Sequence, residues 1–374
     1  MSLETTICGL NFKAPLFVAA GPPSRDAEIL IDCAKNGCGG LVAKTISVEA
    51  AKVARPCMAR PSQTLRDTMI NVELWTDKAP EEWYKDGGEY DKVKAAPECK
   101  DVPLIGSLGY SADDVKKLVP HMEAHVDAYE FSCHYTNLDD IRALATALCS
   151  STKKPVFAKL SPHGHDLLHL AAELRSCGVA GFVVMNSLGP TLALDVETEQ
   201  PLLGGPGGKG WMSGQAVRPI ALYWVSQLAK AMPDVPIIGV GGVGSWRDAV
   251  EFFLAGAWAV QVCTAAIYKG PKVFDEISKG VVDYLKRHGY KNVTELRGRA
   301  LKNLREDGNY VPGVSSVEAD KCLYCGQCAA SCTYEAITVD SKAKTWKVNP
   351  DACYGCGLCT TICPKGALSL AARK

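Results

Sequence analysis

The chain has 374 residues, 47% of them hydrophobic, and equal numbers of basic and acidic residues, 41 of each, leave no formal net charge. This length predicts about two domains, and the balanced charge gives no support for binding nucleic acid or an anionic membrane surface. The sequence has no apolar run of about 18 residues and no signal-peptide pattern at its start, so we expect a cytoplasmic protein without a membrane anchor.

Eight short apolar runs, separated by longer amphipathic stretches, occupy most of the chain before residue 269. They cover residues 15–20, 40–45, 103–107, 128–133, 155–160, 181–186, 236–240 and 259–264. Near-continuous apolar strands that alternate with helices are typical of a parallel sheet covered on both faces. Eight such units predict an α/β fold of the (β/α)8 TIM-barrel type rather than a doubly wound sheet.

Most of these runs end in glycine or in a polar residue, and in a barrel of this type the carboxyl ends of the strands face the active site. Glycine and polar residues are also ordinary in turns. Lys44 and Lys159 are less easily explained in that way. A lysine at the end of an apolar strand must face solvent, an anion or a cofactor. We therefore expect the active site at these strand ends.

Two long segments interrupt the pattern, a polar one at residues 71–99 and a glycine-rich one at residues 189–214. Loops of this length are usually functional, and we expect both to cover the active-site face. Residues 269–305 look helical and close the barrel. The predicted domains are a barrel over residues 1–307, a linker rich in glycine and proline over 308–316, and a small α+β ferredoxin-like domain over 317–374.

The last domain carries eight cysteines in two copies of the pattern Cys-x-x-Cys-x-x-Cys-x-x-x-Cys. This is the bacterial-ferredoxin spacing for two 4Fe-4S clusters, in which the fourth cysteine of each run binds the other cluster. Structural zinc sites use ligands in two pairs, and disulfides are unusual in a reducing compartment. The predicted ligands are Cys322, Cys325, Cys328 and Cys363 for one cluster and Cys353, Cys356, Cys359 and Cys332 for the other.

Iron-sulfur clusters need a redox centre to serve, and the barrel offers one kind of site. Glycines follow the predicted strand at 236–240, but no acidic residue comes after them at the spacing of a dinucleotide fingerprint. Gly241, Gly242 and the pair Cys263 and Thr264 lie where such barrels bind phosphate through backbone N–H groups. Phosphate binding combined with redox chemistry suggests FMN. The two strand-end lysines would then stabilise negative charge on the reduced flavin ring.

Nearly the whole chain, from about residue 6 to 374, resembles the class 1 dihydroorotate dehydrogenases and, more closely, the C-terminal half of dihydropyrimidine dehydrogenase. In the latter an FMN barrel precedes two 4Fe-4S clusters. The matching segments are residues 42–45, 69–74, 131–133, 156–162, 185–187, 213–222, 241–243 and 261–265. The resemblance implies that FMN is bound by Ala20, Gly21, Lys44, Thr45, Lys159, Ser213, Gly214, Gly241, Gly242, Cys263 and Thr264.

The resemblance also implies a mechanism and a substrate site. Cys133 would exchange a proton with a substrate carbon while the flavin exchanges a hydride with the neighbouring carbon; a lone cysteine can also be a small buried hydrophobe. The implied substrate ligands are Asn71, Glu73, Glu130, Asn186 and Ser187. Glu130 replaces an asparagine of the family, and a carboxylate only accepts hydrogen bonds. We therefore do not expect uracil, thymine or dihydroorotate to be substrates.

The leading hypothesis is an FMN- and iron-sulfur-dependent oxidoreductase that acts on a CH–CH or C=C bond conjugated to a carbonyl group. One alternative is the catalytic subunit of an NAD-linked dihydropyrimidine dehydrogenase. Another is an electron-transfer subunit in which FMN is only a relay. We expect a small-molecule substrate and a redox partner, either a ferredoxin or an FAD- and NAD(P)H-binding subunit, within a homo-oligomer or hetero-oligomer.

Overall fold

Eight short, buried strands form a closed parallel barrel in this computed structural model, which describes residues 2–133, 137–162, 166–308 and 313–373. Around the barrel the strand order is β10-β13-β14-β3-β4-β7-β8-β9. The strands are β3 (Leu16–Val18), β4 (Gly40–Val42), β7 (Leu104–Leu108), β8 (Ala128–Ser132), β9 (Val156–Leu160), β10 (Gly181–Val184), β13 (Ile237–Val240) and β14 (Ala259–Val262). Each coincides with one predicted apolar run, apart from Leu108 at the end of β7, so the barrel prediction is confirmed.

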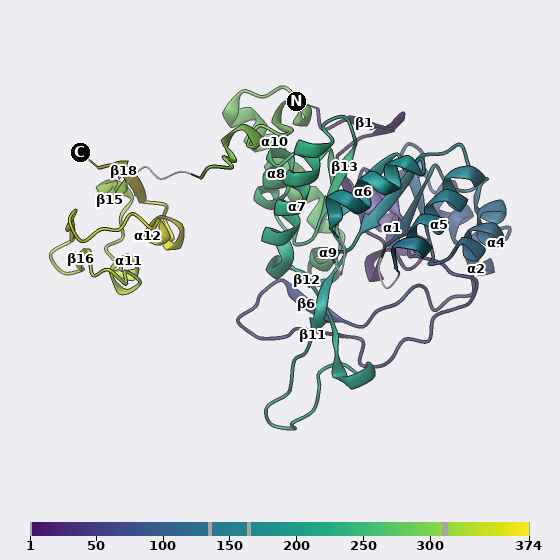
Figure 1. Cartoon of the computed structure of the whole chain (residues 1–374), viewed down its shortest axis with the longest axis horizontal. Coiled ribbons are helices and arrows are strands. Elements are labelled where there is room, and N and C mark those ends of the chain that lie inside the picture. Colours follow the sequence, from purple (N-terminus) through teal and green to yellow (C-terminus); the bar gives the residue numbers. More distant parts are fainter. Residues whose placement is uncertain (1, 134–136, 163–165, 309–312, 374) are drawn as a thin grey trace. The chain divides into compact units, whose positions relative to one another are not determined.

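Helices follow the strands and cover the outside of the barrel (Figure 1). They are α1 (Ala27–Lys35), α2 (Glu81–Tyr84), α3 (Glu89–Ala95), α4 (Ala112–Met122), α5 (Leu138–Ser151), α6 (Leu167–Ser176), α7 (Arg218–Ala231), α8 (Trp246–Leu254), α9 (Thr264–Lys269) and α10 (Lys272–His288). Side-chain caps define several starts: the Ser111 hydroxyl accepts from the N–H of Asp114 at α4. Such caps satisfy N–H groups that lack a partner within the helix. None of the described helices has the length and apolar character that a membrane span requires.

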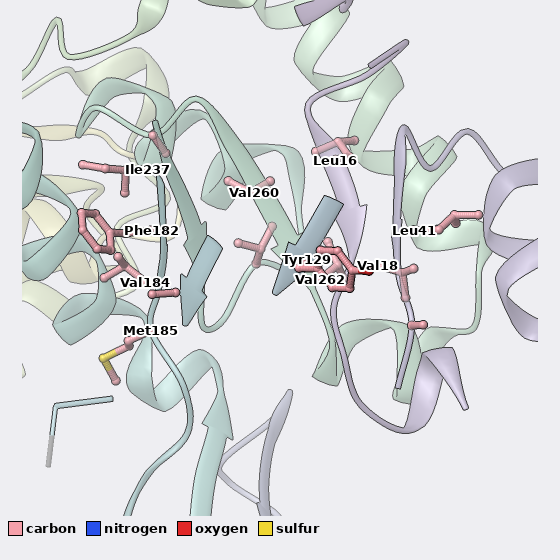
Figure 2. Packing of buried hydrophobic residues seen from close by; sticks show 14 of the residues in the cluster. Leu16, Val18, Leu41, Tyr129, Phe182, Val184, Met185, Ile237, Val260 and Val262 are labelled. Carbon is pink, nitrogen blue, oxygen red and sulfur yellow. The ribbon is translucent and has the colours of Figure 1, made fainter. Parts of the chain in front are cut away.

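Alternation along the strands divides the hydrophobic core into two clusters. The outer cluster lies between strands and helices, and Figure 2 shows part of it, with Val18, Tyr129 and Val260 labelled. The inner cluster fills the barrel and consists of Ile7, Phe12, Phe17, Val42, Ile105, Ala128, Phe157, Val183, Ile238, Val240 and Ala259. Successive side chains of a strand point to opposite sides, so the neighbours Phe17 and Val18 fall in different clusters.

The first two residues of the inner cluster come from outside the barrel wall. They belong to an antiparallel hairpin of β1 (Thr5–Ile7) and β2 (Leu10–Phe12). Ile7 and Phe12 are almost completely buried, at 0% and 1% exposed, and pack against the barrel interior. The hairpin therefore completes the apolar filling of the barrel.

One antiparallel sheet, here called the cover sheet, joins the glycine-rich segment to residues 58–71, so only Asn71 of the polar segment 71–99 belongs to it. Most of that polar segment was wrongly predicted to cover the active-site face, because its helices α2 and α3 pack against each other and α3 packs against α1.

The strand order of the cover sheet is β11-β12-β6-β5, with β5 (Met58–Ala59), β6 (Thr68–Asn71), β11 (Leu188–Thr191) and β12 (Gly210–Gly214). The register pairs Trp211 with Asn71 and Gly214 with Thr68. Figure 1 shows the loop between β11 and β12 extending away from the barrel. Because the pairing joins segments that are far apart in the sequence, it holds both of them over one end of the barrel.

A second compact unit, Leu304–Lys374, follows the first, Met1–Asn303. It pairs β15 (Gly313–Val317) with β18 (Leu368–Ala372) and β16 (Ile337–Asp340) with β17 (Thr345–Val348), and it contains the short helices α11 (Gln327–Ala330) and α12 (Leu358–Ile362). Residues 313–316, predicted as linker, belong to β15 instead, because they pair with β18 at the other end of the unit. Residues 309–312 of that linker lie outside the described residues.

Candidate active site and cysteine sets

A cavity opens at the carboxyl ends of the barrel strands, where the sequence predicts the active site. Its empty space is about 1240 Å³, the open mouth included. Glu130, Lys159 and Gln261 line it, and each lies two positions after a residue of the inner cluster on the same strand. Because side chains repeat every two residues along a strand, these polar groups point into the barrel above its apolar filling.

Lys44, after the end of β4, forms an ion pair with Glu73 on the cavity wall. The lysine Nζ lies 2.9 Å from the carboxylate, and the two side chains are only 7% and 17% exposed. The Arg55 guanidinium lies 3.7 Å from the other oxygen of Glu73. The backbone N–H of Glu73 donates to Oδ1 of Asn71, whose Nδ2 donates to the carbonyl of Trp211. The cover sheet therefore positions the carboxylate that neutralises Lys44.

A second ion pair lies inside the barrel. Oε1 of Glu130 is 3.7 Å from Nζ of Lys159 on the adjacent strand β9, and the carboxylate side chain is 2% exposed. Oε2 of Glu130 accepts a 2.6 Å hydrogen bond from Nε2 of Gln261, which comes from β14 on the opposite side of the barrel. Glu130 lines the cavity as predicted for a substrate ligand, but both of its oxygens already have protein partners.

Hydroxyl and amide groups supply further donors and acceptors in the cavity. Nδ2 of Asn186 donates to Oγ of Ser132 over 3.1 Å, and its Oδ1 accepts from the N–H of Ser187 over 2.8 Å. Thr45 and Ser107 share a hydrogen bond of 2.8 Å. These side chains line the cavity together with both ion pairs. They can bind amide, carbonyl or hydroxyl groups of a ligand without a change in net charge.

Glycines form a wall on which no side chain could be placed. Gly242 has φ of 83°, and a Cβ there would lie 2.6 Å from Cβ of Arg218. Gly214 has φ of 85°, and its Cβ would lie 2.1 Å from the carbonyl oxygen of Asp67. Only glycine combines this conformation with such close contacts. With Gly241 also at positive φ, the backbone N–H groups of this stretch can approach an anion directly.

The neighbouring strand end completes this wall. Thr264 donates a 2.9 Å hydrogen bond to Oγ of Ser213. Cys263 faces Gly21 so closely that a Cβ there would lie 2.9 Å from the sulfur. Burial raises the pKa of the Cys263 thiol, although Lys159 and Lys44 act in the opposite direction. Gly21 and its neighbour Ala20 line the cavity, so all the residues predicted to bind FMN lie around it. An anion cradle beside buried lysines is chemically suited to this cofactor.

Cys133 does not line the cavity. Its N–H donates to the carbonyl of Lys159 over 3.0 Å, which extends the ladder between β8 and β9. Its side chain is 3% exposed and belongs to the outer cluster, as do Tyr129 and Phe131. The strand period explains this position, because alternate residues face the helices while Ser132 faces the cavity. Burial raises the pKa of the Cys133 thiol.

The eight cysteines of the second unit surround two hollows. One is lined by Cys322, Cys325, Cys328 and Cys363, and the other by Cys332, Cys353, Cys356 and Cys359 together with Cys328. The fourth cysteine of each run therefore lies with the first three of the other run. This exchange is what the two-cluster spacing predicts.

Local backbone geometry prepares these sulfurs for metal binding. The N–H of Ala367 donates to Sγ of Cys363 over 3.3 Å, and the N–H of Tyr324 donates to Sγ of Cys322 over 3.4 Å. Against the effect of burial, backbone N–H groups lower the pKa of Cys363, which favours the thiolate that binds metal. No three or more His, Cys, Asp or Glu side chains within the described ranges converge to hold a single metal ion.

The cavity also contains residues that the sequence predictions did not include. Gln261, Ser107 and Ser132 line it. Gln261 is a polar residue within the apolar run 259–264, and such an exception in a buried strand could have indicated an inward-facing polar group. Oε1 of Gln261 is buried and has no hydrogen-bond partner among the described residues. A buried polar atom without a partner commonly marks a place where a ligand or water binds.

Comparison with known proteins agrees with this geometry. Residues 2–285 match the family model "Dihydroorotate dehydrogenase", and residues 315–370 match "4Fe-4S dicluster domain". A dihydroorotate dehydrogenase B (NAD(+)) catalytic subunit from Pyrococcus horikoshii is 33% identical over 313 residues, which cover 80% of this chain and 98% of that protein. The subunit of the same name from Methanosarcina mazei is 33% identical over 315 residues, or 80% of this chain and 95% of that protein. The chain therefore belongs to the dihydroorotate dehydrogenase family, with an iron-sulfur domain following its barrel.

Proposed function

We propose that this chain is an FMN- and iron-sulfur-dependent oxidoreductase that transfers a hydride and a proton across a carbon-carbon bond next to the carbonyl group of a small, uncharged molecule. Family membership makes the chain an oxidoreductase that acts on a CH–CH bond. We add that the substrate is uncharged, because each lysine of the cavity is already paired with a carboxylate.

The charge balance of the cavity separates this chain from an enzyme for an anionic substrate. Lys44 and Lys159 are the only basic side chains among the described residues that line it. A substrate with its own carboxylate, such as dihydroorotate, would have to compete with Glu73 or Glu130 for them. Breaking a buried ion pair costs roughly 3–5 kcal/mol. The cavity therefore favours a cyclic amide or a conjugated carbonyl compound, bound by Asn71 and the pair Asn186 and Ser187.

The residues around the cavity fit FMN as the cofactor. Gly214, Gly241 and Gly242 would hold its phosphate through backbone N–H groups, and Lys44 and Lys159 would supply positive charge near its ring. When bound, FMN supplies a hydride donor and acceptor at N5 of the flavin ring. The inner apolar cluster below the polar layer closes the barrel on that side, which limits the access of water to the site.

The proton is assigned to Cys133 by resemblance to the family, and we keep this assignment as a proposal. The raised pKa of Cys133 keeps its thiol protonated at neutral pH, which suits a proton donor. Because the side chain belongs to the outer cluster, this role requires the thiol to turn toward the cavity. Ser132 is the rival, since its hydroxyl lines the cavity directly.

Electrons are proposed to pass through two 4Fe-4S clusters, one in each cysteine set, to another protein. The relatives are named as catalytic subunits of an NAD-linked enzyme, which favours a separate subunit that binds FAD and NAD(P)H. A free ferredoxin is the other candidate partner. A pure relay is less well supported, because a relay needs no substrate-facing amides such as Asn71 and Asn186.

Anaerobic spectroscopy of the purified full chain tests the proposal. We expect one FMN, about eight irons and eight labile sulfides per chain, as two 4Fe-4S clusters require. The reduced flavin should be reoxidised by an uncharged, conjugated cyclic carbonyl compound, but not by orotate, whose carboxylate would compete with Glu73 or Glu130 for the lysines. Rapid reoxidation by orotate would contradict the substrate class, and rapid reoxidation by uracil would favour the dihydropyrimidine dehydrogenase alternative. Exchange with ferredoxin alone, without any reactive compound, would favour the relay.

A further inference from the structure

The ion pair between Glu130 and Lys159 lies in the wall of the cavity, and both side chains are largely buried. The carboxylate side chain is 2% exposed and the lysine side chain 10% exposed. Along the strands, Ser132 of β8 is the register partner of Lys159 on β9, so Glu130 lies one inward-facing position below the lysine. Two charges in this setting are screened very little by salt or water.

A third residue fixes the carboxylate in place. Gln261 reaches across the barrel from β14 and donates its Nε2–H to Oε2 of Glu130 over 2.6 Å. Oε1 of the same amide has no hydrogen-bond partner in the described part of the chain. The amide thus gives its donor to Glu130 and leaves its acceptor unsatisfied. Hydrogen bonds to ionised groups are worth roughly 1.5–3 kcal/mol, so this contact holds the carboxylate in its position beside Lys159.

We propose that Glu130 acts as the buried counter-ion of Lys159 and thereby lowers the reduction potential of the flavin that occupies this cavity. This inference rests on the proposed FMN site. Reduction adds negative charge to the flavin, and a lysine nearby stabilises that charge. A carboxylate paired with the same lysine cancels much of its effect. Glu130 is therefore a positioning residue that acts through Lys159.

A lowered flavin potential favours reduction of the substrate over its oxidation. A flavin with a lowered potential is a stronger electron donor when reduced. The arrangement suits an enzyme that takes electrons from its iron-sulfur domain and reduces a conjugated double bond. It suits less well an enzyme that collects electrons from a saturated substrate. Glu130 thus favours a reductase of the proposed substrate class.

A redox titration of the full chain with its FMN and clusters tests this inference without any substrate. The FMN is followed by its absorption and the clusters by electron paramagnetic resonance. Glu130→Gln should raise the flavin potential by at least about 30 mV, a tenfold change for a two-electron couple. Lys159→Met should lower it, and the double variant should return close to the unmodified protein. The cluster potentials should stay constant in all variants.

A matched control is Glu89→Gln, which removes a buried carboxylate paired with Lys78 and Lys92 outside the cavity. It should leave the flavin potential unchanged. An unchanged or lowered potential in Glu130→Gln would overturn the inference. So would loss of FMN from both Glu130→Gln and Glu130→Asn while the control retains it, because Glu130 would then only build the cavity. Absence of FMN from the unmodified protein would instead contradict the proposed function.

Discussion

At the scale of single residues, the end of β8 decides which group can handle a proton. Glu130 and Ser132 face the cavity, whereas Tyr129, Phe131 and Cys133 face the helices. A side chain on the outer side reaches a substrate only if it turns toward the cavity. The family resemblance therefore indicates Cys133 as the proton donor, whereas the strand period favours Ser132.

Removal of each group separates the two candidates. If Cys133 is the proton donor, Cys133→Ala should slow substrate-dependent flavin turnover by roughly 100- to 10,000-fold, the usual effect of losing a general acid. Ser132→Ala should then reduce turnover far less. Stopped-flow measurement with each variant, together with its FMN and iron content, makes the comparison. The reverse order of effects would transfer the role to Ser132.

The pH dependence gives a second test of Cys133. A proton donor works in its protonated form, and burial raises the pKa of Cys133 above that of an ordinary thiol, near 8.5. The rate should therefore stay constant as the pH rises through 8 to 9 and fall only at higher pH. The measurement is kcat/KM for the substrate between pH 6 and 10. A loss of rate centred near pH 8.5 would show an unshifted thiol.

The ion pair of Lys44 leads to a prediction about specificity. Glu73→Gln removes the carboxylate 2.9 Å from the lysine and leaves its positive charge uncompensated in the cavity. The variant should bind orotate at least tenfold more tightly, because a hydrogen bond to a charged group is worth roughly 1.5–3 kcal/mol. Perturbation of the flavin spectrum measures the affinity. Equal affinities in the two proteins would mean that Glu73 does not exclude anionic substrates.

At the scale of elements, the strands were predictable because each is a buried apolar run with a polar or glycine end. The strand period also determines which residues enter the cavity, but an apolar run alone does not show which of its alternating residues face inward. Cys133 was predicted to act on the substrate and faces the helices, whereas Gln261 was not predicted and faces the cavity. The cover sheet was not predictable, because its pairing of Asn71 with Trp211 joins segments that no local pattern connects.

The glycine wall offers a matched pair of substitutions at this scale. Gly242 and Gly9 have nearly the same φ, 83° and 82°, but only Gly242 has close neighbours, with nothing within 4 Å of a Cβ at Gly9. Both alanine variants carry backbone strain of order 1–3 kcal/mol. Only Gly242→Ala should also lose FMN. Thermal unfolding and FMN content test this, and equal FMN retention would remove Gly242 from the cofactor site.

At the scale of the whole molecule, the two hydrophobic clusters and the two cysteine runs lie in different units. The outer and inner hydrophobic clusters lie within Met1–Asn303, and all eight cysteines of the two runs lie within Leu304–Lys374. The second unit could be predicted from the sequence, because its cysteine spacing is the one that supplies four thiolates to each 4Fe-4S cluster. Its first strand was missed because residues 313–316 pair only with the far end of the unit.

Truncation after Asn303 follows from this division. The barrel keeps every residue of the cavity, so the shortened protein should bind FMN in a one-to-one ratio and still react with substrate when reduced chemically. It should lose all iron and exchange electrons with a ferredoxin or an NAD(P)H-linked subunit much more slowly, because the clusters proposed to carry the electrons would be missing. The matched comparison is the full chain with Cys325→Ser and Cys356→Ser, which keeps the second unit but removes one ligand from each cluster. Full partner-linked turnover in the truncated protein would show that electrons reach the flavin without passing through the clusters.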